Sequence, residues 1–318
     1  MREEEGVFRT IVEVPEWSCP MQVGHRFVLL GSCFAQNVGE RFLSYGFCAV
    51  CNPLGVTYNP ESIALQVRQA LSPDAHLPLF QAGGQWHCWW TGTLFGSTDE
   101  DALREEVQAV FSSLGESLRK ADFLFVTLGT NVCYRLKESG LTVTNCHKAP
   151  GSLFEEVALD PSTCTSVLAD MMELLSRECP GLRVVFTVSP YRYAKYGFHG
   201  SQLAKAALLL SADEMCRRFP DKAIYFPAYE LLLDDLRDYR FYADDMIHPA
   251  PAAVNYIWRR MTESCMDRTM KQYLELYEPI RAALMHRPTQ GNTDAYIAFR
   301  EKVEEKARRL KEKYGIKT

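Results

Sequence analysis

Residues 26–41 read RFVLLGSCFAQNVGER and predict a strand, a tight turn and a helix. The apolar run at 27–30 is typical of a buried strand, and the spacing of the apolar residues after Cys33 is typical of a helix. Such a turn lifts a small side chain off the end of a sheet and sets it at a helix N-terminus, where unpaired N–H groups favour negative charge. Ser32 and Cys33 are therefore candidate nucleophiles.

Strands and helices alternate along the rest of the chain, which predicts an α/β fold with a parallel sheet. The apolar runs at 122–128 and 183–188 are typical of strands covered on both faces. Shorter strands are expected at 47–50 and 223–226, and a hairpin at 135–143. The predicted helices span 35–45, 61–70, 99–119, 161–178, 201–218 and 229–235.

Two parts are expected: an α/β domain at 1–260 and a helical extension at 261–318, whose charged segment 294–315 predicts a solvated helix. The segment 76–98 contains three tryptophans and predicts a hairpin or an irregular insertion. Its aromatic side chains either pack beneath a loop, the more frequent arrangement, or form a platform for a substrate.

The composition excludes several classes of protein. An apolar fraction of 47% in 318 residues supports a sizeable core, and a net charge of -5 argues against nucleic acid as a partner. No apolar run approaches the roughly 18 residues that span a membrane, and the acidic start at 1–10 is unlike a signal peptide. The lone Cys48-x-x-Cys51 spacing is weak evidence for zinc. We therefore expect a reduced, cytoplasmic protein without a metal or membrane partner.

Polar clusters follow the predicted strands: Gly-Thr-Asn at 129–131, Asn-Cys-His-Lys at 145–148 and Asp-Asp-Met-Ile-His-Pro at 244–249. Open α/β sheets place their sites at the carboxyl ends of strands, so these clusters are expected at one edge. A nucleophile turn after the first strand, a G-x-N after a middle strand and a late D-x-x-H resemble the SGNH (GDSL-like) hydrolase superfamily. The pentapeptide GSCFA at 31–35, together with the later motifs, resembles the GSCFA family within it. The resemblance spans roughly residues 24–260.

The resemblance implies a flavodoxin-like three-layer sheet flanked by helices, no cofactor, and hydrolysis or transfer of an acyl group. It implies that His248 is the general base and Asp245 its orienting carboxylate. It further implies that Asn131 and the N–H at the nucleophile bind the oxyanion, with a looser match for Gly55. Residues at the same edge without a superfamily role are candidate substrate-binding residues: Asn145, His147, Lys148, Arg192 and His199.

The chain departs from the superfamily's G-D-S at the nucleophile. Cys33 stands at the serine position and Ser32 at the aspartate position. Spacing favours Cys33, whose thiolate a helix N-terminus would stabilise, whereas the superfamily's oxygen chemistry favours Ser32. We rank Ser32 narrowly first as the nucleophile and keep Cys33 as the second candidate. In structural terms, Ser32 is alternatively a helix cap and Cys33 a small buried apolar residue.

The expected function is that of an esterase or acyltransferase acting on a small acyl ester, such as an acetyl ester of a carbohydrate. A non-catalytic protein that binds a carbohydrate or another partner on the same fold is the first alternative. A thioesterase or transacylase that depends on Cys33 is the second. The sequence predicts no oligomeric state.

Overall fold

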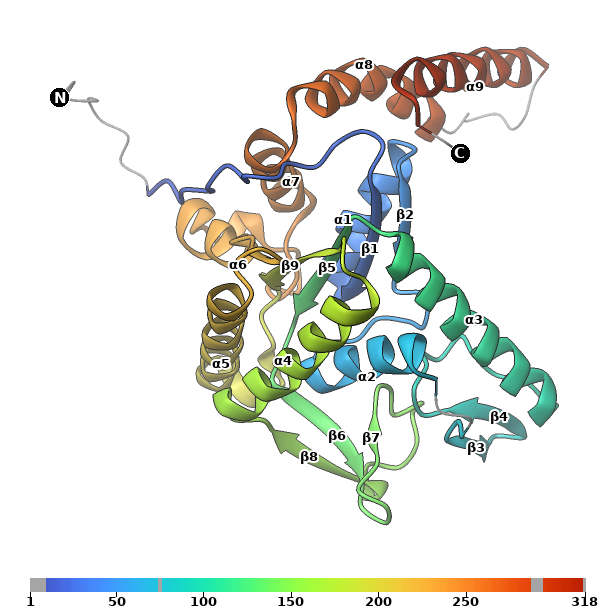
Figure 1. Ribbon diagram of the computed structural model, residues 1–318, viewed down its shortest axis with the longest axis vertical. Coiled ribbons are helices and arrows are strands. Elements are labelled where there is room, and N and C mark those ends of the chain that lie inside the picture. The colour runs from blue at the N-terminus through green and yellow to red at the C-terminus, as the bar shows by residue number, and fades with distance from the viewer. Residues whose placement is uncertain (1–9, 74–75, 287–293, 317–318) are drawn as a thin grey trace.

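The computed structural model describes residues 10–73, 76–286 and 294–316, and a five-stranded parallel sheet forms its centre (Figure 1). The strands are β1 (Arg26–Gly31), β2 (Cys48–Cys51), β5 (Phe123–Leu128), β9 (Arg183–Val188) and β10 (Ala223–Tyr225). They lie in the order β2-β1-β5-β9-β10, so the first strand of the chain is second in the sheet. This is the strand order of flavodoxin-like folds. The α/β prediction is confirmed.

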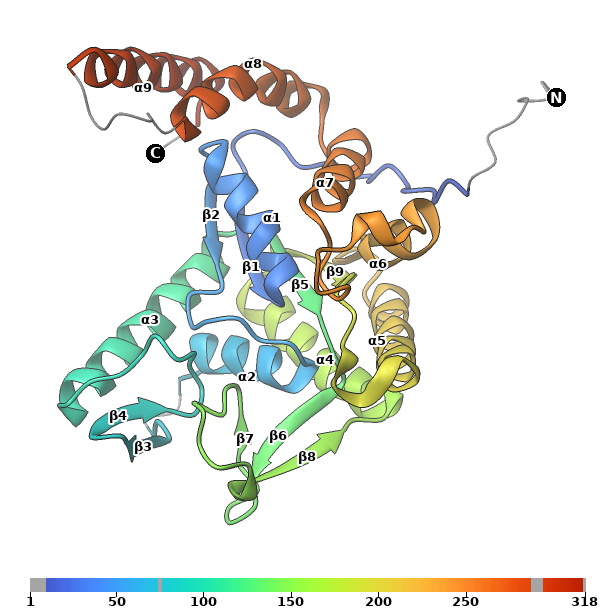
Figure 2. The same cartoon turned by 180° about the vertical axis from the view of Figure 1, so that it is seen from behind.

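Each face of the sheet has its own apolar core. In β1, Val28 and Leu30 face one core, whereas Phe27 and Leu29 face the other, because side chains alternate along a strand. Figure 2 shows α1 lying over the second face. The first core is completed by α2 (Pro60–Leu71), α3 (Glu100–Lys120), α4 (Pro161–Glu178) and α5 (Gly197–Arg218), and the second by α1 (Cys33–Ser44), α7 (Pro251–Cys265) and α8 (Arg268–Met285).

Two small sheets lie beyond the carboxyl ends of the central strands (Figures 1 and 2). One is the hairpin of β3 (Leu79–Ala82) and β4 (Gln85–Cys88), and the other joins β6 (Val132–Leu136), β7 (Thr142–Val143) and β8 (Phe154–Ala158). The hairpins predicted in both regions are confirmed, whereas β8 was not predicted. Short helical turns occur at Gly151–Leu153, Ala194–Tyr196, Ala228–Glu230 (α6) and Tyr239–Phe241, with a π-helical segment at Leu231–Leu236.

The tryptophans of the β3–β4 region pack inside the molecule. The ring of Trp89 stacks on Phe80 at a centroid distance of 3.4 Å, and Trp89 is buried. Trp86 and Trp90 are partly buried against the first core. The packed arrangement is therefore the one present, and these rings do not form an exposed platform.

The C-terminal helices share the second core with the sheet. Trp258 and Met261 of α7 and Tyr273 of α8 are buried in it, so the expected boundary at 260/261 falls inside a continuous helix. Helix α9 (Asp294–Tyr314) lies beside α8 in both views, with Ala307 buried against the core and charged residues on its outer faces. The helix predicted at 294–315 is confirmed.

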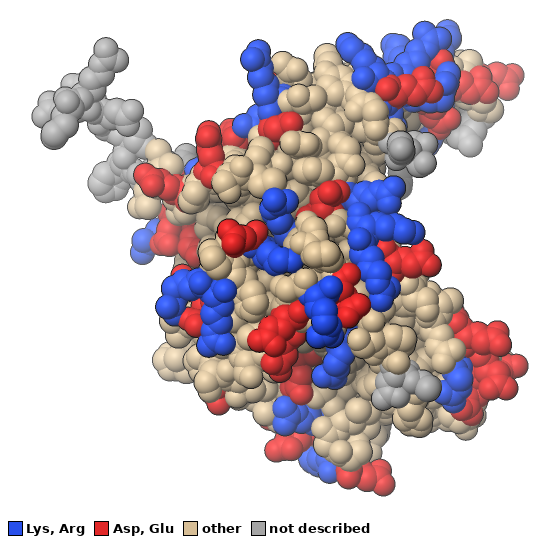
Figure 3. Space-filling model, viewed as in Figure 1, with Lys and Arg blue, Asp and Glu red and all other residues tan. Residues whose placement is uncertain are grey.

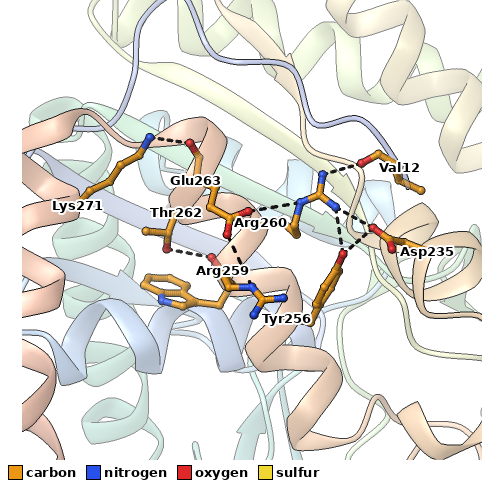
Figure 4. Close-up of polar contacts among 9 residues, drawn as sticks. Val12, Asp235, Tyr256, Arg259, Arg260, Thr262, Glu263 and Lys271 are labelled. Atoms are coloured by element: carbon orange, nitrogen blue, oxygen red, sulfur yellow. Dashed lines mark hydrogen bonds and ion pairs between the residues drawn. The ribbon is translucent and has the colours of Figure 1, made fainter. Parts of the chain in front are cut away.

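Arg260 of α7 ties the N-terminal segment to the body of the protein (Figure 4). Its guanidinium contacts Asp235 Oδ2 at 2.7 Å and donates to the carbonyl oxygen of Val12 at 2.7 Å. The hydroxyl of Tyr256 donates to the same carboxylate at 2.8 Å. The side chain of Asp235 is fully buried and that of Arg260 is 14% exposed, so both charges depend on these contacts.

Replacing Arg260 with alanine removes the guanidinium that pairs with the buried carboxylate of Asp235 at 2.7 Å. We expect this change to lower the free energy of unfolding by about 3–5 kcal/mol, the usual cost of breaking a buried ion pair. The matched control is Arg259→Ala, because Arg259 is 64% exposed and reaches Glu263 only at 3.7 Å. That control should cost less than about 1 kcal/mol. Urea unfolding measures both, and equal losses would contradict this description of the network.

Positive and negative side chains alternate over the face shown in Figure 3. Within the described ranges, no helix is both long enough and apolar enough to cross a bilayer. The start of the chain, on which the signal-peptide expectation rests, lies almost wholly outside the described residues.

Candidate active site

A turn at the end of β1 presents residues 32 and 33 at the carboxyl edge of the sheet. Gly31 has a φ of +132°, and a Cβ there would lie 2.2 Å from the carbonyl oxygen of Thr127, so only glycine fits. Its N–H donates to Asn52 Oδ1 at 2.9 Å, and its carbonyl accepts from the N–H of Thr57 at 3.1 Å. These contacts fix the turn between β1, β5 and the loop after β2.

Ser32 and Cys33 differ in their surroundings. Ser32 is 1% exposed and caps α1, with its Oγ accepting from the N–H of Phe34 at 3.3 Å. Cys33 begins α1 and is partly exposed. Burial raises the pKa of the Cys33 thiol above its ordinary value, and the N–H groups of Cys33 and Phe34 offset only part of that rise. The helix N-terminus therefore faces the sulfur, and the capping role considered for Ser32 is present.

Asp245 and His248 form the hydrogen-bonded pair that the D-x-x-H spacing predicts. Nδ1 of His248 lies 2.5 Å from Asp245 Oδ2. Oδ1 of Asp245 accepts from the N–H groups of Ile247 and His248 at 2.9 Å each. The hydrogen bond from the imidazole, followed by those two backbone bonds, lowers the pKa of Asp245 to about 2. With Nδ1 held by the carboxylate, Nε2 is left as the basic nitrogen.

Tyr191, in the loop after β9, is near both this pair and Cys33. Its ring centroid is 4.6 Å from that of His248. Burial raises the pKa of Tyr191, and the negative charges of the Cys33 thiolate and Asp245 raise it further. The hydroxyl therefore lies within electrostatic reach of both, so residues from three separate segments meet at one edge. Sequence reasoning missed Tyr191, although its position just after a predicted strand was a usable signal.

Lys205 of α5 is a second residue that the sequence did not reveal. It is 1% exposed, and its Nζ donates to the carbonyl oxygens of Gly129 at 2.7 Å and Ser189 at 2.8 Å. Burial lowers its pKa to about 7, and the Cys33 thiolate acts in the opposite direction. Within the described part of the chain no carboxylate pairs with this ammonium group. The protonated form of Lys205 therefore stabilises the thiolate of Cys33.

Replacing Lys205 with methionine removes that cation at similar length. Because Lys205 lowers the pKa of Cys33, we expect less thiolate at neutral pH and a rate of iodoacetamide alkylation that rises only at higher pH. Mass spectrometry of the tryptic peptide 27–41, in which Cys33 is the single cysteine, measures this rate. The control is Lys222→Met, since Lys222 also donates to a backbone carbonyl, that of Pro180, but at the other edge. Coinciding pH profiles for wild type and Lys205→Met would contradict this role.

Two of the expected oxyanion donors already have backbone partners. The amide of Asn131 donates to the carbonyl oxygen of Leu159 at 2.6 Å. The N–H of Gly55 donates to the carbonyl oxygen of Asn52 at 2.9 Å, closing a turn, and Gly55 packs against the backbone of Gly92. The Gly55 N–H is therefore not free for an oxyanion. The hydrogen bond from Asn131 to Leu159 links the start of β6 to the segment just before α4.

The polar loop at 145–148 packs with the β3–β4 hairpin. Nε2 of His147 lies 2.9 Å from the carbonyl oxygen of Cys88, and burial lowers the pKa of this histidine. Asn145 Oδ1 accepts from the N–H of His147, and Lys148 is exposed with a φ of +58°. These contacts hold the loop in place, and none of them joins it to Cys33 or His248.

Arg192 supports the loop that carries His248, whereas His199 is exposed on the first turn of α5. The guanidinium of Arg192 donates to the carbonyl oxygen of Met246 at 3.1 Å and lies 4.0 Å from the ring centroid of Phe198. No group of three or more metal-binding side chains occurs among the described residues, and the eleven cysteines, all of which are described, are free.

Fold and site together define an α/β protein with a cysteine and a histidine–aspartate pair at the carboxyl edge of a parallel sheet. A family model described as the GSCFA family matches residues 26–261. A second, described as GSCFA domain protein, C-terminal domain, matches residues 277–316. The chain belongs to the GSCFA family, and this part of the resemblance is confirmed. No curated protein matches the chain.

Proposed function

We propose that this protein is an acyl-transferring enzyme, an esterase or an acyltransferase, in which Cys33 is the nucleophile, His248 the general base and Asp245 its orienting residue. The observation that carries the proposal is that a partly exposed thiol at a helix N-terminus and an imidazole whose Nδ1 is fixed by a carboxylate both lie near Tyr191. Ser32 is less suited, because it is buried and its Oγ caps α1.

In the proposed reaction, Cys33 gives its proton to Nε2 of His248 and the sulfur attacks the carbonyl carbon of an ester. The π electron pair moves onto the carbonyl oxygen. Collapse of this tetrahedral species breaks the bond to the alcohol, which leaves with the proton from His248, and the acyl group remains on Cys33 as a thioester. Water or an acceptor alcohol then takes the acyl group by the same steps.

We further propose that the family belongs with the SGNH hydrolases. Support comes from the strand order β2-β1-β5-β9-β10, the turn after the first strand and the late histidine–aspartate pair. The free cysteines support a cytoplasmic location.

The substrate that we propose is a small acyl ester, such as an acetylated carbohydrate. A cavity of about 390 Å³ borders the loop of His248, because Arg192, which lines it, also donates to the carbonyl oxygen of Met246. The cavity has polar and aromatic walls, as sugar sites do, and its lining includes Arg192, Gln202, Asp234, Tyr239 and Tyr242.

The test is turnover of a panel of acyl esters and thioesters by wild type and by Cys33→Ala. Turnover that the substitution abolishes supports the proposal, and preference for thioesters would point to the thioesterase alternative. Turnover that survives in Cys33→Ala contradicts it. The non-catalytic alternative has less support, because Trp89 is buried and Trp86 and Trp90 are partly buried against the first core.

A further inference from the structure

An acyl-transfer step needs hydrogen-bond donors for the oxyanion, and the structure leaves a shortage of them at Cys33. One of the two N–H groups of the Asn131 side chain and the N–H of Gly55 already donate to backbone carbonyls, those of Leu159 and Asn52. The N–H groups at the start of α1 and the second N–H of Asn131 remain. An oxyanion in a site of this kind is normally bound by two or three preorganised donors, and further side chains near Cys33 can supply them.

The backbone of Tyr58 is held next to the nucleophile turn. Its carbonyl oxygen accepts from the N–H groups of Gly129 at 2.7 Å and Thr130 at 3.0 Å, and the preceding residue, Thr57, donates to Gly31 in the nucleophile turn. Its ring lies against Gly129, where a Cβ would come within 3.2 Å of Cδ1. The side chain is 37% exposed, so a substrate can reach it.

Tyr191 follows the carboxyl end of β9, at the same edge of the sheet. Its N–H lies 3.4 Å from Ser189 Oγ, at the end of β9, and its ring contacts the imidazole of His248. Within the described ranges, neither the hydroxyl of Tyr191 nor that of Tyr58 has a hydrogen-bond partner, whereas the hydroxyls of Tyr225, Tyr229 and Tyr256 are all bonded to side chains. Two hydroxyls without a protein partner among the described residues therefore lie within electrostatic reach of Cys33.

We propose that the hydroxyls of Tyr58 and Tyr191 donate hydrogen bonds to the oxyanion that forms when Cys33 attacks a carbonyl carbon. This inference rests on the proposed function and names two catalytic residues for it. In the step, the carbon–sulfur bond forms as the π pair moves to oxygen, and both phenols keep their protons while they donate. The bonds are strongest when the oxygen carries the full charge, so they favour the transition state over the bound ester.

The electrostatics of the site are consistent with phenols that remain protonated. Burial raises the pKa of Tyr58, and the nearby Cys33 thiolate and Tyr191 raise it further. Burial and the same thiolate raise the pKa of Tyr191. Both hydroxyls thus stay donors throughout the neutral range, which a hydrogen bond to an oxyanion requires.

The test compares acylation with alkylation in Tyr58→Phe and Tyr191→Phe, which delete one hydroxyl each and keep the ring. Acylation by 4-nitrophenyl acetate, followed as the first release of nitrophenolate, passes through an oxyanion, whereas alkylation by iodoacetamide does not. We expect each change to slow acylation about 10²-fold and to leave alkylation of Cys33 unchanged. Tyr193→Phe is the control, since Tyr193 touches the ring of Tyr191 but its hydroxyl lies near Tyr134.

Acylation at the wild-type rate in both phenylalanine variants would overturn the inference and leave the proposed function standing. An equal fall in acylation and alkylation would also overturn it, because the hydroxyls would then act on the thiol and not on the oxyanion. Failure of wild type to accept an acyl group on Cys33 would overturn both the proposed function and the inference. If the rings act only by stacking on the substrate, the Tyr→Ala variants should acylate more slowly and the Tyr→Phe variants should acylate at the wild-type rate.

Discussion

Cys33→Ala should lower turnover of acyl esters by about 10⁴–10⁶-fold, the range found when the nucleophile of a triad is removed. The physical reason is that the substitution removes the atom that carries the acyl group, while the helix N-terminus and the His248–Asp245 pair stay in place. Steady-state kinetics on the best ester of the panel measures the loss. Cys33→Ser adds a test of the thiol itself, because a serine hydroxyl at this position lacks the acidity of the thiol.

The matched control is the neighbouring change Ser32→Ala. It removes the cap of α1, at a cost of about 1 kcal/mol in stability, and should leave turnover within the same order of magnitude. Loss of activity in Ser32→Ala together with full activity in Cys33→Ala would assign the nucleophile to Ser32 and contradict the account.

His248→Ala should lower turnover nearly as much as Cys33→Ala, because His248 is the base that the loop at 243–249 contributes to the site. Asp245→Asn keeps the shape of the pair but disfavours the tautomer in which Nε2 is basic, and should lower kcat about 10⁴-fold. Asp244→Asn is the control for charge, since Asp244 is exposed next to Asp245. An equal fall of kcat in Asp245→Asn and Asp244→Asn would show that catalysis does not depend on the hydrogen bond between Asp245 and His248 Nδ1.

The low pKa of Asp245 sets the pH range over which this pair persists. A carboxylate whose pKa is lowered in the folded state keeps its interaction above that pKa and loses it as the pH falls through the value. With a pKa of about 2, Asp245 stays ionised when the pH drops from 7 to 4. Any fall of activity between pH 7 and pH 4 is therefore not caused by protonation of Asp245, and the same fall should occur in Asp244→Asn. Nuclear magnetic resonance should show the hydrogen bond between His248 Nδ1 and Asp245 intact over this range.

The central sheet was predictable because its strands are buried on both faces. The apolar runs at 27–30, 122–128 and 183–188 leave few alternatives to parallel strands, and all three are present. Strand β8 was missed because Phe154–Ala158 carries two exposed glutamates and gains its stability from pairing with β6, which lies far from it in sequence.

The candidate site was only partly predictable. Asp245 and His248 are three residues apart, so their pairing follows from local spacing. Tyr58, Tyr191 and Lys205 come from three different segments and meet only because β1, β5 and β9 end at one edge of the sheet. Which of Ser32 and Cys33 is exposed depends on the direction in which α1 starts, and that direction is fixed by the contacts of Gly31 with Asn52 and Thr57.

The most direct test is to acylate the protein with 4-nitrophenyl acetate, quench it at low pH and fragment the tryptic peptide 27–41 in a mass spectrometer. This peptide contains both candidates, and fragmentation between residues 32 and 33 separates them. The account predicts an acetyl group on Cys33 that neutral hydroxylamine removes, as it does a thioester, and that is absent in His248→Ala. An acetyl group on Ser32, or one on Cys33 that forms equally well without His248, would contradict it.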